Sequence, residues 1–94
     1  MEATDKITAG TILVCIRTQA TGCGIQYCKK GSIVKCALTP KSYHDSIPIF
    51  RNEKEEKVDK WLPVDRKKLR IASPEEVHMY YEGKYFLEEV EAAE

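Results

Sequence analysis

The amino-acid sequence predicts a mainly β domain that carries a helix at its C-terminal end. Between residues 10 and 72, short runs of β-branched and apolar residues alternate with glycine-containing turns, which is the pattern of strands. A serine–proline–glutamate signal at residue 73 then starts a helix. The 94 residues fit one domain, 1–94, with residues 1–9 as a loose lead-in. We therefore expect a small barrel, or a strongly bent antiparallel sheet, with a C-terminal helix packed on it.

Several stretches have the composition of strands, and two residues within or before them carry positional information. Gly31 supplies a turn with positive φ before the long strand that follows it. Pro48 lacks the N–H that a central strand donates, so we expect its strand at an edge of the sheet. The charged residues 51–60 are expected to be a solvated loop or one helical turn. The expected strands are residues 11–16, 25–28, 32–38, 47–50, a segment anchored by Trp61 and Leu62, and residues 68–71.

The first expected strand is apolar on both faces. Ile12, Val14 and Ile16 point to one face, and Leu13 and Cys15 point to the other. A strand of this kind is covered on both faces in a folded protein. The sheet interior covers one set, so either the C-terminal helix or a second copy of the chain must cover the other. A homodimer is therefore one expectation.

The C-terminal segment, residues 73–94, is expected to be helical, acidic and rich in aromatic side chains. Ser73 suits the N-cap, Pro74 the first helical position and Glu76 the third, which together form a capping box. Gly83 leaves two outcomes open, because a glycine either ends a helix or lies inside it at a cost of about 1 kcal/mol. A helix that continues would project and favour a partner, whereas one that ends would let the chain fold back as a monomer.

Charge is unevenly distributed although the net charge is zero. Residues 1–72 hold fourteen Lys and Arg against eight Asp and Glu, whereas residues 73–94 hold one Lys against seven Glu. No stretch approaches the ~20 apolar residues of a membrane span, and the first residues lack the pattern of a signal peptide. We therefore expect a cytoplasmic protein with reduced thiols and no membrane partner.

All four cysteines lie within a short part of the chain, which raises the question of a metal site. Cys15 and Cys36 alternate with apolar neighbours on strands and are interpreted as core residues, whereas Cys23 lies between two glycines in a loop. Structural zinc sites usually use Cys-x2-Cys pairs, and the closest spacing here is Cys23-x4-Cys28. Zinc on Cys15, Cys23, Cys28 and Cys36 is thus the weaker alternative, and we expect no metal or cofactor.

The sequence does not favour an enzyme. A nucleophilic pair of Cys23 and His44 would need a third, orienting group such as Asp45. No glycine-rich phosphate loop is present, and adjacent glutamates on a helix point in different directions. We therefore expect a protein that acts by binding.

Two parts of the sequence are candidates for binding a macromolecule. The C-terminal segment holds four aromatic residues within seven positions, more than one helix face needs against a small core. Two of them are expected in the core and the others on the surface, where tyrosine is favoured at protein interfaces. The expected protein-binding residues are Tyr80, Tyr81, Tyr85, Phe86, Glu88 and Glu89.

The alternative is nucleic-acid binding through a basic hairpin, residues 66–70. Its cations would contact phosphates, and Trp61 would offer a ring on which a base stacks. The expected residues are Arg66, Lys67, Lys68, Arg70 and Trp61. A solvated surface paired with the acidic segment is the simpler explanation of the same charges.

The order of several motifs resembles a class of small SH3-like β-barrel proteins, many of which are carried by tailed bacteriophages. A glycine precedes a strand ending in Cys-Ile, a Lys-Gly turn opens the next long strand, and Leu-Arg leads to a Ser-Pro-Glu-Glu helix start. The matching positions are Gly10, Cys15, Ile16, Lys30, Gly31, Val34, Trp61, Leu69, Arg70, Ala72, Ser73, Pro74, Glu75 and Glu76. The resemblance covers about residues 7–78. It implies a non-catalytic phage accessory protein that binds a host protein and inhibits or redirects it, with no catalytic residue.

Overall fold

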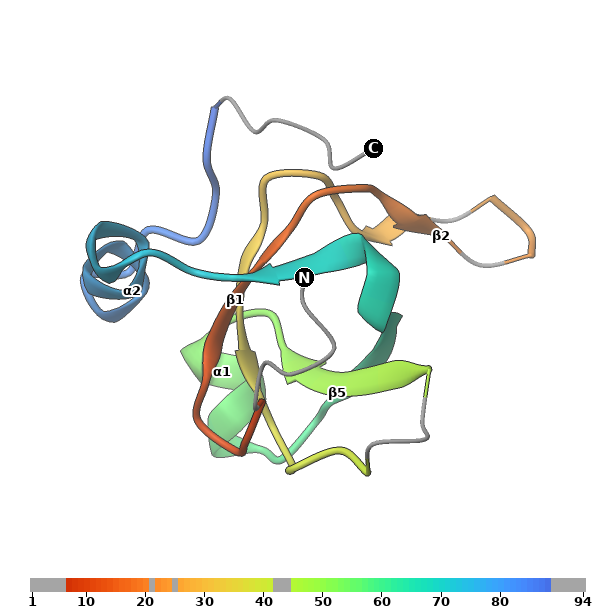
Figure 1. Ribbon diagram of the computed structural model, residues 1–94, viewed down its shortest axis with the longest axis horizontal. Helices are drawn as coiled ribbons and strands as arrows, with labels where there is room; N and C mark the ends of the chain where they lie inside the picture. The colour runs from red at the N-terminus through yellow and green to blue at the C-terminus, as the bar shows by residue number, and fades with distance from the viewer. Residues whose placement is uncertain (1–6, 21, 25, 42–44, 89–94) are drawn as a thin grey trace.

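The computed structural model describes residues 7–20, 22–24, 26–41 and 45–88, and its fold is mainly β with one C-terminal helix, as the sequence predicts (Figure 1). The described part of the chain contains seven strands, two α-helices and one 3-10 helix. In chain order these are β1 Ile12–Cys15, β2 Gln19–Ala20, β3 Gln26–Cys28, β4 Ile33–Cys36, β5 Ser46–Phe50, α1 Glu53–Lys57, β6 Leu62–Asp65, η1 Arg66–Lys68, β7 Leu69–Ile71 and α2 Pro74–Tyr81.

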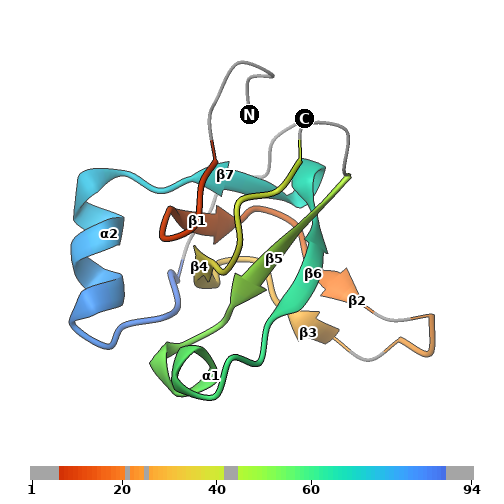
Figure 2. The same cartoon turned by 90° about the horizontal axis from the view of Figure 1, so that it is seen from below.

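Five strands form one antiparallel sheet in the order β6-β5-β4-β1-β7, and β2 and β3 form a separate hairpin. The end strands β6 and β7 are connected by the three residues of η1, so the sheet bends strongly enough to bring its two ends within reach of one short turn. No ladder joins β6 to β7 among the described residues, so the sheet is not a closed barrel. Figure 2 shows α2 and the β2–β3 hairpin at opposite ends of the molecule.

The prediction that the proline-containing strand lies at an edge is wrong, because β5 lies between β4 and β6. The missing N–H of Pro48 breaks no ladder, for two reasons. Towards β6, Pro48 lies opposite Pro63, which also lacks an N–H. Towards β4, the strand pairing has ended at Cys36, and the carbonyl of Pro48 still accepts a 2.8 Å hydrogen bond from the N–H of Ala37.

Two apolar clusters lie on the two faces of β1. The first cluster packs Leu13 and Cys15 against side chains of β3, β4, β5, β6 and β7. The second packs Ile12 and Val14 against Ile33, α2 and the residues that follow α2. Both apolar faces of the first strand are therefore covered within one chain. This coverage removes one of the observations behind the homodimer expectation, which itself stays a prediction.

The second cluster is closed by α2 and by residues 84–88, which we call the C-terminal strap. Ser73 and Glu76 form the predicted capping box, and Pro74 is the first helical residue. The helix ends at Tyr81 and Gly83 adopts φ +87°, so of the two outcomes that Gly83 left open the structure has the one in which the helix ends, and residues 82–88 are not helical. Residues 89–94, including Glu89, lie outside the described residues.

Burial corrects the expectation for the lead-in and adds one detail to that for the charged segment. Ile7 is 5% exposed and packs in the first cluster, so the loose lead-in does not extend to residue 9. The charged segment 51–60 contains the expected short helix, α1, and most of its residues are exposed. Glu55 is the exception at 8% exposed, because Arg51 holds it. The backbone N–H of Arg51 donates to the Glu55 carboxylate at 2.8 Å, and its Nη1 donates to the carbonyl of Tyr27 at 3.0 Å. Arg51 also forms an ion pair with Glu55 through its guanidinium, and these contacts together tie α1 to β3.

Candidate functional site

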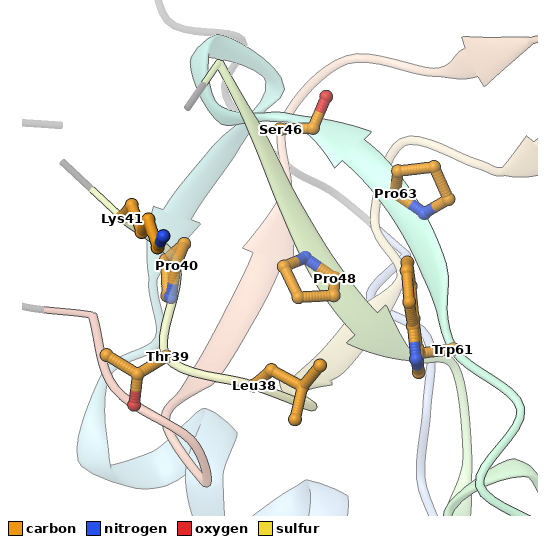
Figure 3. Close-up of a pocket in the computed structure, with 8 residues that line it drawn as sticks. All are labelled: Leu38, Thr39, Pro40, Lys41, Ser46, Pro48, Trp61 and Pro63. Atoms are coloured by element: carbon orange, nitrogen blue, oxygen red, sulfur yellow. The ribbon is translucent and has the colours of Figure 1, made fainter. Parts of the chain in front are cut away.

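A groove of about 370 Å³ lies on the outer face of β5 and β6, beside the segment that follows β4 (Figure 3). A volume of this size is at the lower end of the range for ligand pockets. Most of its wall is apolar, and among the described residues that line it one, a lysine, is charged. We call it the Trp61 groove, and its lining residues are Leu38, Thr39, Pro40, Lys41, Ser46, Pro48, Trp61 and Pro63.

The floor of the Trp61 groove follows from the alternation of two paired strands. Ile47, Ile49 and Val64 are fully buried, so the residues between them on β5 and β6 face outwards. These outward residues are Pro48 and Pro63, which lie directly opposite each other. Proline has almost no side-chain entropy to lose, so the floor is apolar and already rigid before anything binds.

The walls of the Trp61 groove are formed by exposed apolar side chains. Figure 3 shows Trp61 on one side, Pro40 and Lys41 on the other, and Pro48 between them. Trp61 is 43% exposed and Leu38 is 52% exposed. Exposed apolar side chains gathered at a concave surface are typical of binding sites.

Arg66, the first residue of the basic helix η1, lies beside this groove. The Nη2 of Arg66 donates to the carbonyl of Lys41 at 3.3 Å, and its backbone N–H donates to the carbonyl of Asp45. Lys41 lines the groove on the side opposite Trp61, so Arg66 contacts a residue of that side. The structure thus places these two residues of the nucleic-acid alternative along one surface.

The other residues of that alternative are arranged differently from the prediction. Residues 66–70 are not a hairpin, because η1 leads directly into β7 at the far end of the sheet order from β6. The backbone N–H of Lys67 donates to the Asp65 carboxylate at 2.9 Å. Arg70 is bound to Glu76, with both Nη atoms 2.8 Å from carboxylate oxygens. This carboxylate, rather than a phosphate, occupies the guanidinium fork of Arg70.

The C-terminal aromatics divide into two pairs, as the sequence predicts. Tyr80 is fully buried in the second cluster, and Tyr85 packs against that cluster with partial burial. Tyr81 and Phe86 are 54% and 53% exposed. Glu88, two residues after Phe86, is also exposed. Of the residues expected to bind a protein, Tyr80 therefore belongs to the core, while Tyr81 and Phe86 remain available on the surface.

The cysteines also follow the sequence interpretation. Cys15, Cys28 and Cys36 are buried in the first cluster, and Cys23 is exposed. A hydrogen bond with Cys15 and burial raise the pKa of the Cys28 thiol well above its ordinary value. Burial also raises the pKa of Cys36. These environments keep both thiols protonated and unreactive at neutral pH.

The described residues offer no clear catalytic or metal-binding constellation. Among them, no group of three or more His, Cys, Asp or Glu side chains is placed to hold a metal ion. His44, which the thiol-enzyme alternative requires, lies outside the described residues. His78 is on the surface of α2, where its Nε2 lies 3.2 Å from Glu82. The absence of a metal and of enzyme activity stays a prediction.

Comparison with protein-family models, with curated proteins and with solved structures finds no match for this chain. Within the described residues, no helix has the length and apolar character needed to cross a membrane. The Trp61 groove and its surroundings are therefore interpreted from their own geometry.

Sequence reasoning identified Trp61 but missed the groove to which it belongs. Pro48 and Pro63 are fifteen positions apart in the sequence, and their opposition depends on the register of β5 and β6. The sequence predicts Leu38 in a strand, but this residue follows the end of β4 and is exposed. One sequence feature could have indicated the groove: each of two neighbouring strands contains a proline. Such a pair predicts an outward face without ladder hydrogen bonds.

Proposed function

We propose that this chain is a non-catalytic SH3-like accessory protein, of the kind that tailed bacteriophages carry, and that it binds a host protein in the cytoplasm to inhibit or redirect it. The observation that carries the proposal is the Trp61 groove. It presents one exposed tryptophan and one exposed leucine above a floor of two opposed prolines. The motif order in the sequence and a strongly bent five-stranded sheet support the SH3-like part of the proposal.

The composition of the groove suits a protein partner. Tryptophan is among the residues most enriched at binding hot spots, where it fills a desolvated pocket on the partner. Fully burying a side chain of the size of leucine contributes about 1.5–3 kcal/mol. The rigid floor reduces the ordering cost that binding has to overcome. Tyr81 and Phe86 are two further exposed aromatic residues, which a large partner could also contact.

The proposal is tested with Trp61→Ala, because this residue is the only tryptophan in the chain. Tagged protein is used to capture partners from a nuclease-treated bacterial lysate, and each captured protein is purified and titrated. Binding at the groove is expected to shift the emission of Trp61 to shorter wavelength, and Trp61→Ala is expected to weaken the complex at least tenfold.

The matched control is Tyr81→Ala, which removes an equally exposed aromatic ring away from the groove. A partner that responds to Tyr81→Ala but not to Trp61→Ala would move the binding site to the C-terminal aromatics. A purified partner that leaves Trp61 emission unchanged and binds both variants as the wild type does would contradict the proposal.

A second candidate function is favoured by one observation, which is that Lys41 lines the groove and Arg66 donates a hydrogen bond to the carbonyl of Lys41. A base stacked on Trp61 with phosphates near these cations would give single-stranded nucleic-acid binding. Titration with a short oligonucleotide at two salt concentrations separates this function from the first. Quenching of Trp61 that weakens steeply with salt would favour nucleic acid over protein.

A further inference from the structure

The C-terminal strap completes one edge of the sheet. The backbone N–H of Ile33 donates to the carbonyl of Tyr85, and the N–H of Leu87 donates to the carbonyl of Gly31, each at 2.8 Å. Ser32 lies opposite Phe86 in an antiparallel bridge. β5 pairs with β4 only at Lys35 and Cys36. The strap therefore occupies the part of this edge that β5 does not reach.

The side chains of the strap alternate as in a strand. Tyr85 and Leu87 pack against the second cluster, beside Ile12, Val14 and Ile33. Phe86 and Glu88 face solvent. The fit is close, since a Cβ on Gly31 would lie 2.6 Å from the carbonyl oxygen of Leu87. The acceptor edge is thus shaped for this particular segment.

A single glycine turns the strap back onto the sheet. Gly83 has φ +87°, its N–H donates to the carbonyl of Tyr80, and the N–H of Lys84 donates to that of Met79. This is the Schellman arrangement that ends a helix. No atom outside the adjacent residues lies within 4 Å of a Cβ built on Gly83. With a negative φ at this position the helix would continue and carry the strap away from its own sheet.

We infer that the C-terminal strap is an exchangeable strand, which a second copy of this chain can supply to the edge at Gly31–Ile33. A second copy is the occupant because the edge is shaped for residues 85–87, and a symmetric exchange re-forms every contact of the monomer. Only the hinge at Gly83 differs between the two forms. The inference does not rest on the proposed function of the Trp61 groove.

The protein concentration at which the exchanged dimer becomes detectable depends on how strongly the strap binds its own edge. A short connection gives the strap an effective concentration of about millimolar at its own edge. The wild type is therefore monomeric at micromolar concentration, and exchange becomes populated when the chain refolds near about 1 mM. In the exchanged dimer, the strap packs on the sheet of the partner copy and forms the same two backbone hydrogen bonds there.

A disulfide at the Ser32–Phe86 bridge identifies exchange directly. The pattern of neighbouring hydrogen bonds makes this a non-hydrogen-bonded pair, with Cα atoms about 4.5 Å apart, which is within disulfide range. Ser32→Cys and Phe86→Cys are prepared as separate single variants in a Cys23→Ser background, mixed, refolded at high concentration and oxidised. A disulfide between residues 32 and 86 can then form only between two chains. Peptide mapping is expected to find it.

The hinge is tested with Gly83→Ala. Alanine at a positive φ is strained in the monomer, and exchange relieves that strain in both copies. The dimerisation constant is expected to rise by about tenfold per copy, or roughly 100-fold in all. The control is Gly10→Ala, since Gly10 also has a positive φ and open space but lies far from the hinge in sequence.

Each result of these experiments either supports or overturns exchange of the strap. A 32–86 interchain disulfide, with Gly83→Ala dimeric and Gly10→Ala monomeric by light scattering, supports exchange. A concentrated mixture that yields no such disulfide overturns it, even if Gly83→Ala fails to fold. So does dimerisation of Gly83→Ala after an intrachain 32–86 disulfide has locked the strap on its own sheet, because that dimer must use another surface.

Discussion

Arg70 holds Glu76 with two hydrogen bonds of 2.8 Å, one from each Nη atom to each carboxylate oxygen. The same carboxylate accepts a third hydrogen bond, also of 2.8 Å, from the backbone N–H of Ser73. Arg70 belongs to β7 and Ser73 caps α2. One carboxylate therefore fixes the start of the C-terminal helix to the last strand. Arg70 lowers the pKa of Glu76 to about 2.

This pair predicts a specific loss of stability in acid. Glu76 has a pKa of about 2 in the folded state against an ordinary value of 4.5, so its contribution is complete above about pH 4.5. The contribution is lost as the pH falls from there towards 2, because the unfolded state takes up the proton first. Glu76→Gln is expected to lower the free energy of unfolding by about 2 kcal/mol at pH 7 and by much less near pH 2.

Urea unfolding at a series of pH values measures this effect. The control is Glu75→Gln, which neutralises an exposed carboxylate in the same first turn of α2. Equal losses for the two variants would show that helix-dipole effects, and not the bond to Arg70, account for the change.

Gly31→Ala is expected to release the C-terminal strap. The change places an L-residue at φ +97° and a Cβ 2.6 Å from the carbonyl oxygen of Leu87. Gly24→Ala is the matched control, because Gly24 has φ +85° and open space around it. We expect Gly31→Ala to cost about 1–3 kcal/mol more than Gly24→Ala. Amide exchange should be faster at Ile33 and Leu87 in Gly31→Ala alone, and unchanged protection there would refute the strap contact.

Tyr80→Phe is expected to stabilise the protein by about 1 kcal/mol. The Tyr80 hydroxyl is buried, and no described residue hydrogen-bonds to it, so its removal ends a desolvation penalty. Burial also raises the pKa of Tyr80 above its ordinary value of 10.0. The wild type should therefore lose stability above pH 10 relative to the variant, because only the unfolded state ionises there. Thermal unfolding of the wild type and of Tyr80→Phe, at neutral pH and above pH 10, measures both effects.

One of the four thiols is expected to react quickly in the native state. Cys23 is exposed, whereas Cys15, Cys28 and Cys36 are buried. A thiol-specific reagent should modify one cysteine per chain at once and the other three only in denaturant. Cys23→Ser should remove the fast phase. A fast phase that persists in this variant would mean that β1, β3 or β4 opens readily.

Features that depend on neighbouring residues could be predicted from the sequence. The Ser73–Glu76 capping box, the alternation of Leu13 with Cys15 and the turn at Gly31 each need only local conformation and side-chain period. The same reasoning predicted that the C-terminal aromatics divide between core and surface. Hydrophobic period and turn chemistry act over a few residues, so they leave a signal that one sequence carries.

Features that depend on which strands meet were decided only by the tertiary structure. Pro48 predicted an edge strand, and only its register against Pro63 shows how a proline fits between two neighbours. The bond from Arg70 to Glu76 and the strap on Gly31 join elements whose meeting no local pattern specifies. Trp61 was recognisable as an aromatic ring on which a base could stack, but the groove around it needs the bend of the sheet and the course of the chain after β4. Long-range register and strand order set these contacts, and they arise from packing rather than from local propensity.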